Sequence, residues 1–337
     1  MQPSRRAFLM GRATPRTPWQ VFCQSLRRVC AGELKLIHSA VGAEATIPGA
    51  GGPDRATTAT TAAAADAAFP TAAGFHTAGS AQAAPQARWT PVDGANVRQA
   101  RMLCAEHGVQ LALAGSAVSI EGRPVLWVDP AALNGLARES GPVPRWRAGP
   151  GVTLGELAAA GLPQFAGADP AITLAAWFAD RGAAAWPTGR GDLSGVHEAD
   201  VLLADGVADT LGPFGADDGR PLRSATLQQL VPVLFRLASG EDARWCGEQP
   251  AWPARYRLDA LLPAAPATLN LARMLHGHGG TLVWLESLVL EAPPGASPPP
   301  PPDVAGPAAP LPPARARALD RRVKDSFDPA GLFPEAP

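Results

Sequence analysis

The stretch that decides the fold is RWRAGPGVTLGEL, residues 145–157. A short strand-like run, RWRA, ends in the turn Gly149-Pro150-Gly151. A helix start follows almost at once, because Thr153 and Glu156 have the spacing of a T-x-x-E capping box. Two glycines let the backbone adopt positive φ and approach another group closely. The pattern predicts a strand, a tight turn and a helix, and leaves open whether the turn binds an anion or only connects the two elements.

Further helices and strands are predicted on each side of this turn. A helix is expected around 97–104, where apolar residues share one face, Asp93 or Asn96 caps the start and Gly108 closes the end. The sequence VQLALAG at 109–115 and PVLWVD at 124–129 read as strands, and Asp129-Pro130 starts a further helical turn.

The second half of the chain has the same mixed character. We expect strands at 199–206 and 281–292 and helices at 268–277 and 315–327. Another helix is expected from Thr226, with a T-x-x-Q cap and a kink or early end at Pro232. Together these elements predict an α+β fold.

Two tracts of biased composition divide the 337-residue chain, which contains 35 glycines and 37 prolines. Residues 39–88 are rich in Ala, Thr, Gly and Pro and are expected to form a disordered linker, and 291–313 a proline-rich linker. The remaining parts are predicted to be a basic N-terminal segment at 1–38 with a docking helix at Trp19–Cys30, a folded domain at 89–290, and a C-terminal helix and tail at 314–337.

Charge and composition exclude several classes of partner. The formal net charge of −1 gives no positive field for nucleic acid, and no apolar stretch is long enough to span a membrane. Four scattered cysteines predict free thiols rather than a metal site. The twin-arginine pattern at Ser4–Gly11 lacks a following apolar region, so a cytoplasmic protein is expected.

Familiar catalytic motifs are missing from the sequence. A G-x-G-x-x-G reading of the glycine turn places Leu154 where the third glycine belongs, which argues against a Rossmann dinucleotide site. His278 is read as either a catalytic base or, with more weight, a histidine of a surface turn. Tyr256 is read as a packing residue, and no catalytic residue is assigned.

What the chain does contain is an ordered series of short motifs. They are Cys104–Gly108, Gly115-Ser116, Gly151–Leu157, Asp169-Pro170, Leu202–Gly206, Tyr256-Arg257-Leu258, Gly277–Leu282 and Phe327–Phe333. In this order they resemble the FAD-linked oxidases of the p-cresol methylhydroxylase and vanillyl-alcohol oxidase superfamily. Within it the chain looks most like the D-lactate dehydrogenases and the FAD-binding subunit of glycolate oxidase.

This resemblance implies a two-subdomain FAD-binding fold of the p-cresol methylhydroxylase type. It also implies that the cofactor lies between the subdomains and touches mostly backbone. The residues it places around the cofactor are Gly115, Ser116, Gly149, Gly151 and Val152 on one wall and Asp169, Pro170 and Thr173 on the other.

Three departures from the family pattern bear on function. The pyrophosphate loop lacks its arginine and second glycine, Trp177 and Phe178 stand where small residues are typical, and a proline-rich tract replaces the substrate-binding cap. We therefore expect weak, non-covalent FAD binding, because charge-assisted hydrogen bonds to phosphate are lost. The function implied is an oxidoreductase, or its flavin subunit, that oxidises a small 2-hydroxy acid such as glycolate or D-lactate. The alternative is a degenerate, non-catalytic partner subunit of a flavoprotein or iron–sulfur oxidase complex.

Overall fold

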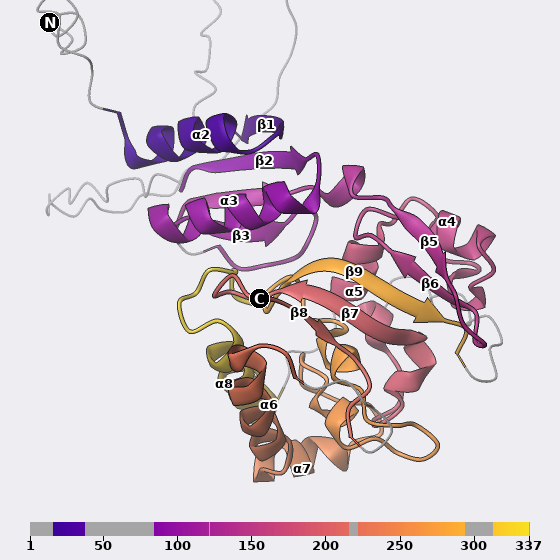
Figure 1. The fold of residues 1–337 in the computed structure, drawn as a ribbon. Helices are drawn as coiled ribbons and strands as arrows, with labels where there is room; N and C mark the ends of the chain where they lie inside the picture. The colour runs from indigo at the N-terminus through magenta and orange to yellow at the C-terminus, as the bar shows by residue number, and fades with distance from the viewer. Residues whose placement is uncertain (1–15, 38–83, 121, 216–221, 294–312, 337) are drawn as a thin grey trace, which may run out of the picture. The chain divides into compact units, whose positions relative to one another are not determined.

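The computed structural model describes residues 16–37, 84–120, 122–215, 222–293 and 313–336 (Figure 1). Most of the two predicted linkers and the arginine pair near the N-terminus lie outside these ranges. The described residues belong to one compact unit.

The first sheet has four strands in the order β1-β2-β4-β3. Strand β4 pairs in parallel with both β2 and β3, whereas β1 is antiparallel to β2. The strands are β1 (Gly32–Ile37), β2 (Gln86–Pro91), β3 (Gln110–Leu113) and β4 (Val125–Val128).

Two helices accompany this sheet, α2 (Pro18–Val29) and α3 (Gly94–His107). Asp93 caps α3 and Gly108 ends it in the left-handed region, as predicted. The predicted docking helix, α2, packs against α3 and buries Phe22 and Leu26 (Figure 1). Phe22 and Leu26 therefore serve the chain's own core, whereas Val21 and Val29 of the same helix stay exposed at 38% and 50%.

Strand β1 was not predicted from the sequence. It lies within the segment expected to be a separate N-terminal region, and it pairs with β2 over its whole length, from Gly32 opposite Pro91 to Ile37 opposite Gln86. Strand β2 starts at Gln86, three residues before the predicted boundary at Trp89. The N-terminal segment is thus part of the first sheet.

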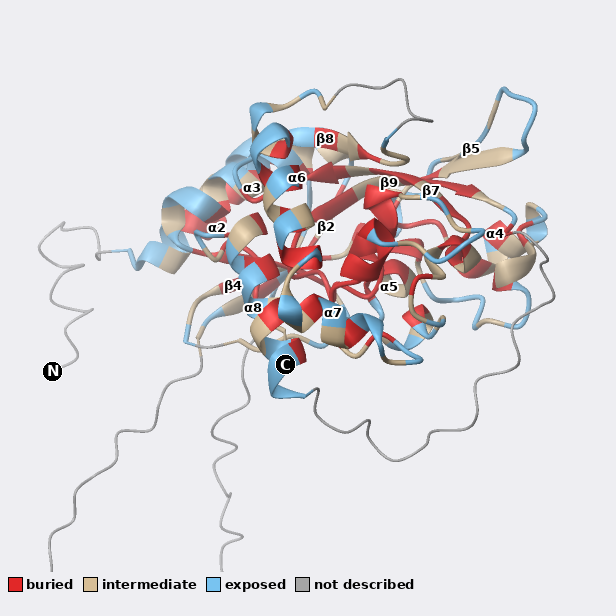
Figure 2. Ribbon diagram, turned by 90° about the horizontal axis from the view of Figure 1, so that it is seen from below, coloured by how far each residue is buried: buried red, intermediate tan, exposed pale blue. Residues whose placement is uncertain are grey.

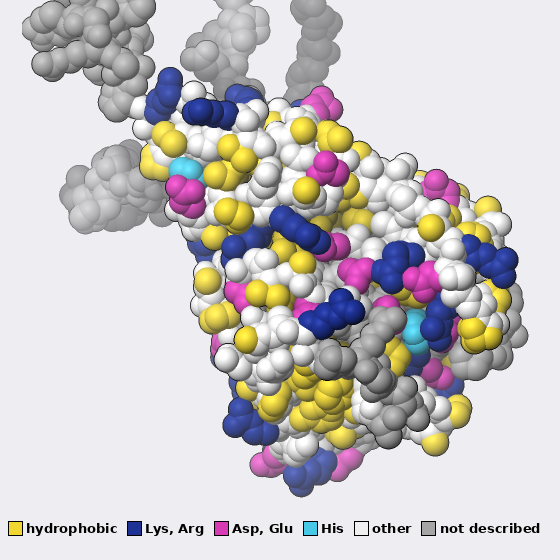
Figure 3. All heavy atoms as spheres, viewed as in Figure 1, with side chains coloured by type: hydrophobic (Ala, Val, Ile, Leu, Met, Phe, Trp, Pro, Cys, Tyr) yellow, Lys and Arg dark blue, Asp and Glu magenta, His cyan; other side chains and the backbone are white. Residues whose placement is uncertain are grey.

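The second sheet is antiparallel and has five strands in the order β5-β6-β9-β7-β8. Ion pairs lie along it: Arg147 on β6 contacts Glu139 and Glu198 at 2.9 and 3.7 Å and also pairs with Asp200. Figure 3 shows charges of both signs side by side across the middle of one face. The strands are β5 (Leu136–Glu139), β6 (Arg145–Ala148), β7 (Val196–Leu202), β8 (Ala208–Leu211) and β9 (Trp284–Glu291).

Helices fill the rest of the second half. The α-helices are α4 (Leu154–Ala159), α5 (Leu174–Ala179), α6 (Ala225–Ala238), α7 (Glu241–Gly247) and α8 (Ala314–Phe327). The 3₁₀ turns are η1 (Pro130–Ala132), η2 (Pro163–Phe165), η3 (Gly182–Ala184), η4 (Gly191–Ser194), η5 (Leu258–Leu261) and η6 (Leu271–Leu275).

Two predicted helices differ in detail. Ser224, not Thr226, caps α6, because the Thr226 hydroxyl instead donates to Asp205. Helix α6 also continues through Pro232 to Ala238, so the proline does not end it. The region 268–277 forms only the short turn η6, which Asn270 caps.

Buried residues concentrate where the second sheet meets the helices, and Figure 2 shows β7, β9 and α5 mostly in the buried colour. Separate helices with one mixed and one antiparallel sheet confirm the α+β class. All four cysteines are buried and free, as predicted. Among the described helices, none has the length and apolar character needed to cross a membrane.

Candidate cofactor-binding site

The chain's own backbone requires glycine at positions 149 and 151. Gly149 donates its N–H to the Gly135 carbonyl at 2.8 Å, and Gly151 donates to the Leu133 carbonyl at 3.0 Å. A Cβ on Gly149 would lie 2.3 Å from the Leu133 oxygen, and one on Gly151 would lie 2.1 Å from the Pro130 oxygen. Close approach is indeed why glycine stands here, but the group approached is the segment 130–135.

The turn also holds the predicted opposite wall. Leu154 donates its N–H to the Ile172 carbonyl at 2.9 Å, and Gly155 donates to the Pro170 carbonyl at 3.2 Å. Thr173 caps α5 with its hydroxyl, and the Asp169 carboxylate accepts from the N–H of Ala171. Residues 149–155 and 169–173, which the resemblance places on opposite walls of a cofactor site, are therefore joined directly by hydrogen bonds within the chain.

The predicted capping box is present. The Thr153 hydroxyl accepts from the Glu156 N–H, and the Glu156 carboxylate accepts from the Thr153 N–H at 2.8 Å. Val152, by contrast, has a fully buried side chain in the hydrophobic core. Its side chain packs in the core beneath the surface and is not accessible to a ligand.

The loop after β3 is different, because it keeps free hydrogen-bond donors. Gly115 has φ +84° and an exposed backbone, with nothing within 4 Å of an added Cβ. In the described part of the chain, the N–H groups of Gly115, Ala117 and Val118 have no protein acceptor. The Ser116 hydroxyl donates back to the Leu113 carbonyl at 2.8 Å, which tightens the loop. Backbone donors of this kind suit a phosphate.

This loop packs against the predicted GHGGTL turn. Gly280 has φ +72°, and a Cβ on it would lie 3.1 Å from the Leu113 Cβ and 3.8 Å from the Ser116 hydroxyl oxygen. The structure therefore brings together two motifs that are more than a hundred residues apart in the sequence. Glycine at 280 allows the close approach.

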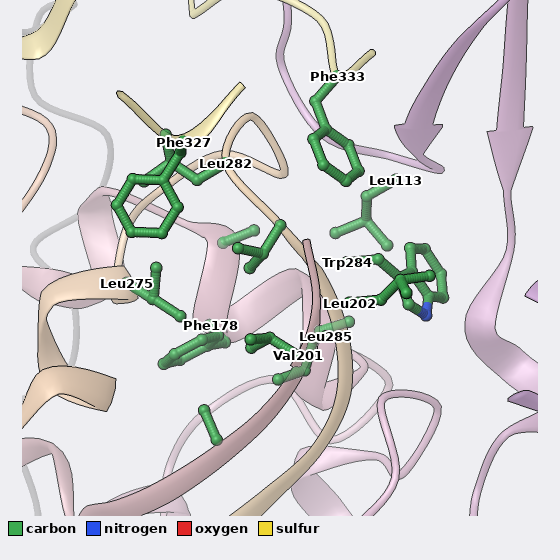
Figure 4. Packing of buried hydrophobic residues seen from close by; sticks show 14 of the residues in the cluster. Leu113, Phe178, Val201, Leu202, Leu275, Leu282, Trp284, Leu285, Phe327 and Phe333 are labelled. Carbon is green, nitrogen blue, oxygen red and sulfur yellow. The ribbon is translucent and has the colours of Figure 1, made fainter. Parts of the chain in front are cut away.

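A small cavity lies beside these two turns. It is lined by Leu111, Leu113, Ala175, His278, Gly280, Val283, Trp284, Leu285 and Phe333. It has room for about one water molecule. Figure 4 shows Leu113 and Phe333 on one side and Trp284 and Leu285 below them. Ala175 joins the cavity to the glycine turn, since its N–H donates to the Pro150 carbonyl at 2.9 Å.

His278 is buried in the wall of this cavity, so its assignment to a surface turn was wrong. It is 3% exposed, and its Nδ1 has no partner among the described residues. Burial, with the positive charges of Arg255 and Lys324, lowers the pKa of His278 to about 3. The imidazole is therefore neutral at pH 7, and it can accept a proton only at a cost in free energy.

His276 was missed by the sequence reasoning. It is fully buried between Trp177 and Trp186, whose ring centroids lie 4.4 and 4.6 Å from its own in edge-to-face geometry. Burial holds its pKa well below the ordinary value, and neither ring nitrogen has a hydrogen-bond partner in the described structure. A neutral histidine enclosed by aromatic rings leaves no signal in the sequence except its closeness to Gly277.

Tyr256 packs in the core, in agreement with the prediction. Its hydroxyl lies 2.8 Å from the Thr281 hydroxyl, and burial raises the pKa of the phenol. Thr281 in turn donates to the His278 carbonyl at 2.5 Å. This network fixes the turn that carries Gly280.

The residues present fit a diphosphate better than an isoalloxazine ring. In the described structure, Gly115, Ala117 and Val118 keep unpaired N–H groups, but the cavity next to this loop is walled by side chains that include Leu113, Trp284 and Phe333. Ligand pockets for small molecules usually measure ~300 Å³ or more, and a space for one water is far below that. The cavity beside the loop, as lined by the described residues, is therefore too small to hold the ring.

No protein-family model matches the chain, and no curated protein matches it. Solved structures resemble it at low identity. A cholesterol oxidase from Brevibacterium sterolicum is 14% identical, with 62% of this chain and 34% of that chain covered and a TM-score of 0.34. The glucooligosaccharide oxidase from Acremonium strictum is 15% identical over 61% of this chain and 34% of that chain, with a TM-score of 0.34.

A xylooligosaccharide oxidase from Myceliophthora thermophila C1, in complex with xylobiose, is 15% identical over 62% of this chain and 36% of that chain, again with a TM-score of 0.34. This chain therefore spans about a third of the length of these solved structures. The Acremonium enzyme is described as having a novel flavinylation.

Proposed function

We propose that this chain is an FAD-binding protein of the flavin-oxidoreductase type, and that the loop 115–118 holds the diphosphate of FAD. The observation that carries the proposal is the set of unpaired N–H groups on Gly115, Ala117 and Val118. Gly115 would contact phosphate directly, and Ser116, whose N–H and hydroxyl both donate to the Leu113 carbonyl, would hold the loop in shape. The N–H groups of Gly149 and Gly151 are already bonded within the chain, so these glycines would act by holding the turn in place and would not contact phosphate.

The binding we propose is weak and non-covalent. Residues 113–119 contain no arginine, histidine or cysteine, so the loop offers neither a charged partner for phosphate nor a side chain for covalent attachment. When bound, flavin would supply hydride-transfer chemistry. The described residues around the loop would bind and orient the diphosphate, and His278 would place an uncharged imidazole in the cavity wall.

The substrate is a finer proposal that rests on the order of the sequence motifs alone. We propose a small 2-hydroxy acid such as glycolate or D-lactate, with reaction in the cytoplasm. No described residue is assigned as the base.

A second candidate function is favoured by the small size of the cavity beside the loop. A cavity with room for about one water, walled by Trp284 and Phe333, would suit a non-catalytic subunit that keeps the fold of a flavoprotein beside an active partner. In that case the ring site would have been filled by the chain's own side chains.

Titration of the purified protein with FAD tests the proposal. Binding should quench tryptophan fluorescence and raise the melting temperature. Gly115→Ala should weaken binding tenfold or more, because the new Cβ faces the open space where phosphate would lie.

Gly161→Ala is the matched control. Gly161 is also exposed, has φ +92° and has nothing within 4 Å of an added Cβ, so it carries the same backbone strain away from the loop. If the wild-type protein shows neither quenching nor a thermal shift at millimolar FAD, the flavin proposal fails and the non-catalytic subunit replaces it.

A further inference from the structure

A buried lysine is the centre of an unusual set of contacts near the C-terminus. Lys324 on α8 has a side chain only 4% exposed. Its ammonium donates to the Asp328 carboxylate at 2.6 Å, the Thr281 carbonyl at 2.8 Å and the Phe333 carbonyl at 3.0 Å. All three donor positions of an ammonium are thus used. A buried cation with complete pairing is costly to disturb.

The partner carboxylate holds the start of the tail. Asp328 is fully buried, and its two oxygens accept from the N–H groups of Leu332 and Phe333, both at 2.8 Å. Lysine, aspartate and the backbone of 331–333 therefore form one closed unit, which we call the tail clasp. The clasp fixes the direction in which the chain leaves α8.

From the clasp the tail runs along the outer edge of β3 to the candidate loop. Leu111 donates its N–H to the Leu332 carbonyl at 2.9 Å, and Ser119 donates to the Glu335 carbonyl at 3.0 Å. The Phe333 ring lines the same cavity as Leu113 and His278. Both ends of the segment 111–119 are thus tied to the tail, while the N–H groups of Gly115, Ala117 and Val118 between them have no acceptor among the described residues.

We propose that Lys324 is a positioning residue for the loop 115–118. It holds the tail, and the tail holds the loop in the shape that presents its N–H groups. The part of this inference that concerns binding rests on the proposed function. The part that concerns loop order does not.

Amide hydrogen exchange of the full-length protein tests the ordering. In Lys324→Met, exchange at Leu111 and Ser119 should accelerate tenfold or more, and FAD affinity should fall at least fivefold. Leu319→Ala is the control, because Leu319 is a buried apolar residue of the same helix that takes no part in the clasp. It should lower the melting temperature without changing exchange at Ser119 or FAD affinity.

A second variant keeps the test decisive if Lys324→Met does not fold. A chain that ends at Pro334 retains all three Lys324 acceptors, including the Phe333 amide carbonyl, but removes the Glu335 carbonyl that Ser119 uses. Exchange at Ser119 should accelerate and FAD affinity should fall there too.

Three results are decisive. Unchanged exchange at Ser119 in Lys324→Met, or in the shortened chain if Lys324→Met does not fold, would overturn the inference. Tighter FAD binding by the shortened chain would also overturn it, since the tail would then cover the loop instead of positioning it. Absence of FAD binding by the wild type would refute the proposed function, and the exchange rates would still decide whether Lys324 orders the loop.

Discussion

Arg98 and Glu286 form a two-pronged ion pair that joins the two sheets. Arg98 lies on α3, which accompanies the first sheet, and it donates from Nε and Nη2 to the two carboxylate oxygens of Glu286 at 2.7 and 2.6 Å. Glu286 lies on β9, the central strand of the second sheet. The Arg98 side chain is 55% exposed and that of Glu286 is 14% exposed, so solvent screens the pair from one side only.

We expect this pair to contribute a modest coupling energy. A double-mutant cycle with Arg98→Met and Glu286→Gln should give about 0.5–1 kcal/mol in the free energy of unfolding, because one partner is largely exposed. Urea denaturation at low and high salt measures it. The coupling should shrink at 1 M salt, and a salt-independent value would show that packing of the arginine stem, not charge, holds the contact.

The glycine turn should tolerate no side chain. Gly151→Ala should destabilise the protein by about 3 kcal/mol or more, because its Cβ would meet backbone atoms that cannot move independently. Gly161→Ala, at positive φ in open space, should cost only about 1–2 kcal/mol. Chemical denaturation compares the two. Equal costs would mean that the turn can shift away from the segment 130–135.

Stability should fall in acid partly because of His278. The pKa of His278 is about 3 in the folded state, and it is about 6.5 in an unfolded chain. Between these values the unfolded state takes up a proton that the folded state excludes, so stability is lost as the pH falls. Each pH unit in that window costs about 1.4 kcal/mol for one such histidine.

The variant His278→Gln removes this titration. The wild type should exceed it in unfolding free energy by an amount that shrinks by about 2 kcal/mol between pH 7 and pH 5. Parallel pH curves for the two proteins would show that the imidazole is protonated in the folded state. Urea unfolding at a series of pH values provides the measurement.

The small size of the cavity predicts how ADP and FAD should compete for the loop 115–118. If only the diphosphate is held, ADP should displace FAD with a Kd within about threefold of the FAD value, a difference of less than 1 kcal/mol. Fluorescence titration with each nucleotide gives both constants. FAD binding that is tenfold tighter than ADP binding would mean that the isoalloxazine ring also contacts the protein, after side chains such as Phe333 and Trp284 have moved.

Local signals in the sequence predicted much of the fold. The Thr153–Glu156 capping box, the Asp93 and Gly108 ends of α3 and the strand at Trp284–Glu291 depend on neighbouring residues, so the sequence records them directly. Strand β1 was missed although Glu33-Leu34-Lys35-Leu36 alternates polar and apolar residues, because the strand is mostly exposed and depends on its pairing with β2, which the local sequence does not record. The start of α6 was misplaced because Thr226 has the right residue type but a long-range partner in Asp205.

The site was harder to predict for a physical reason. A glycine marks close approach, but the sequence does not say whether the group approached is a ligand or the chain itself. Gly151 meets the Pro130 carbonyl, whereas Gly115 faces open space. His278 was misread in the same way, since a histidine between glycines in a turn is usually exposed, and here the tail residue Phe333 helps to enclose it.

The path of the tail has a consequence for the order of folding during synthesis. Arg123, just before β4, donates to the Gly331 carbonyl across a separation of 208 residues, and the tail also occupies the open side of β3. A growing chain could form the β2-β4-β3 part of the first sheet early, but β3 would keep an uncovered edge until the residues near 331 had left the ribosome. Until that moment the edge is available to other extended chains, so a chaperone that shields strand edges would be of most use to this protein before its tail has paired with β3.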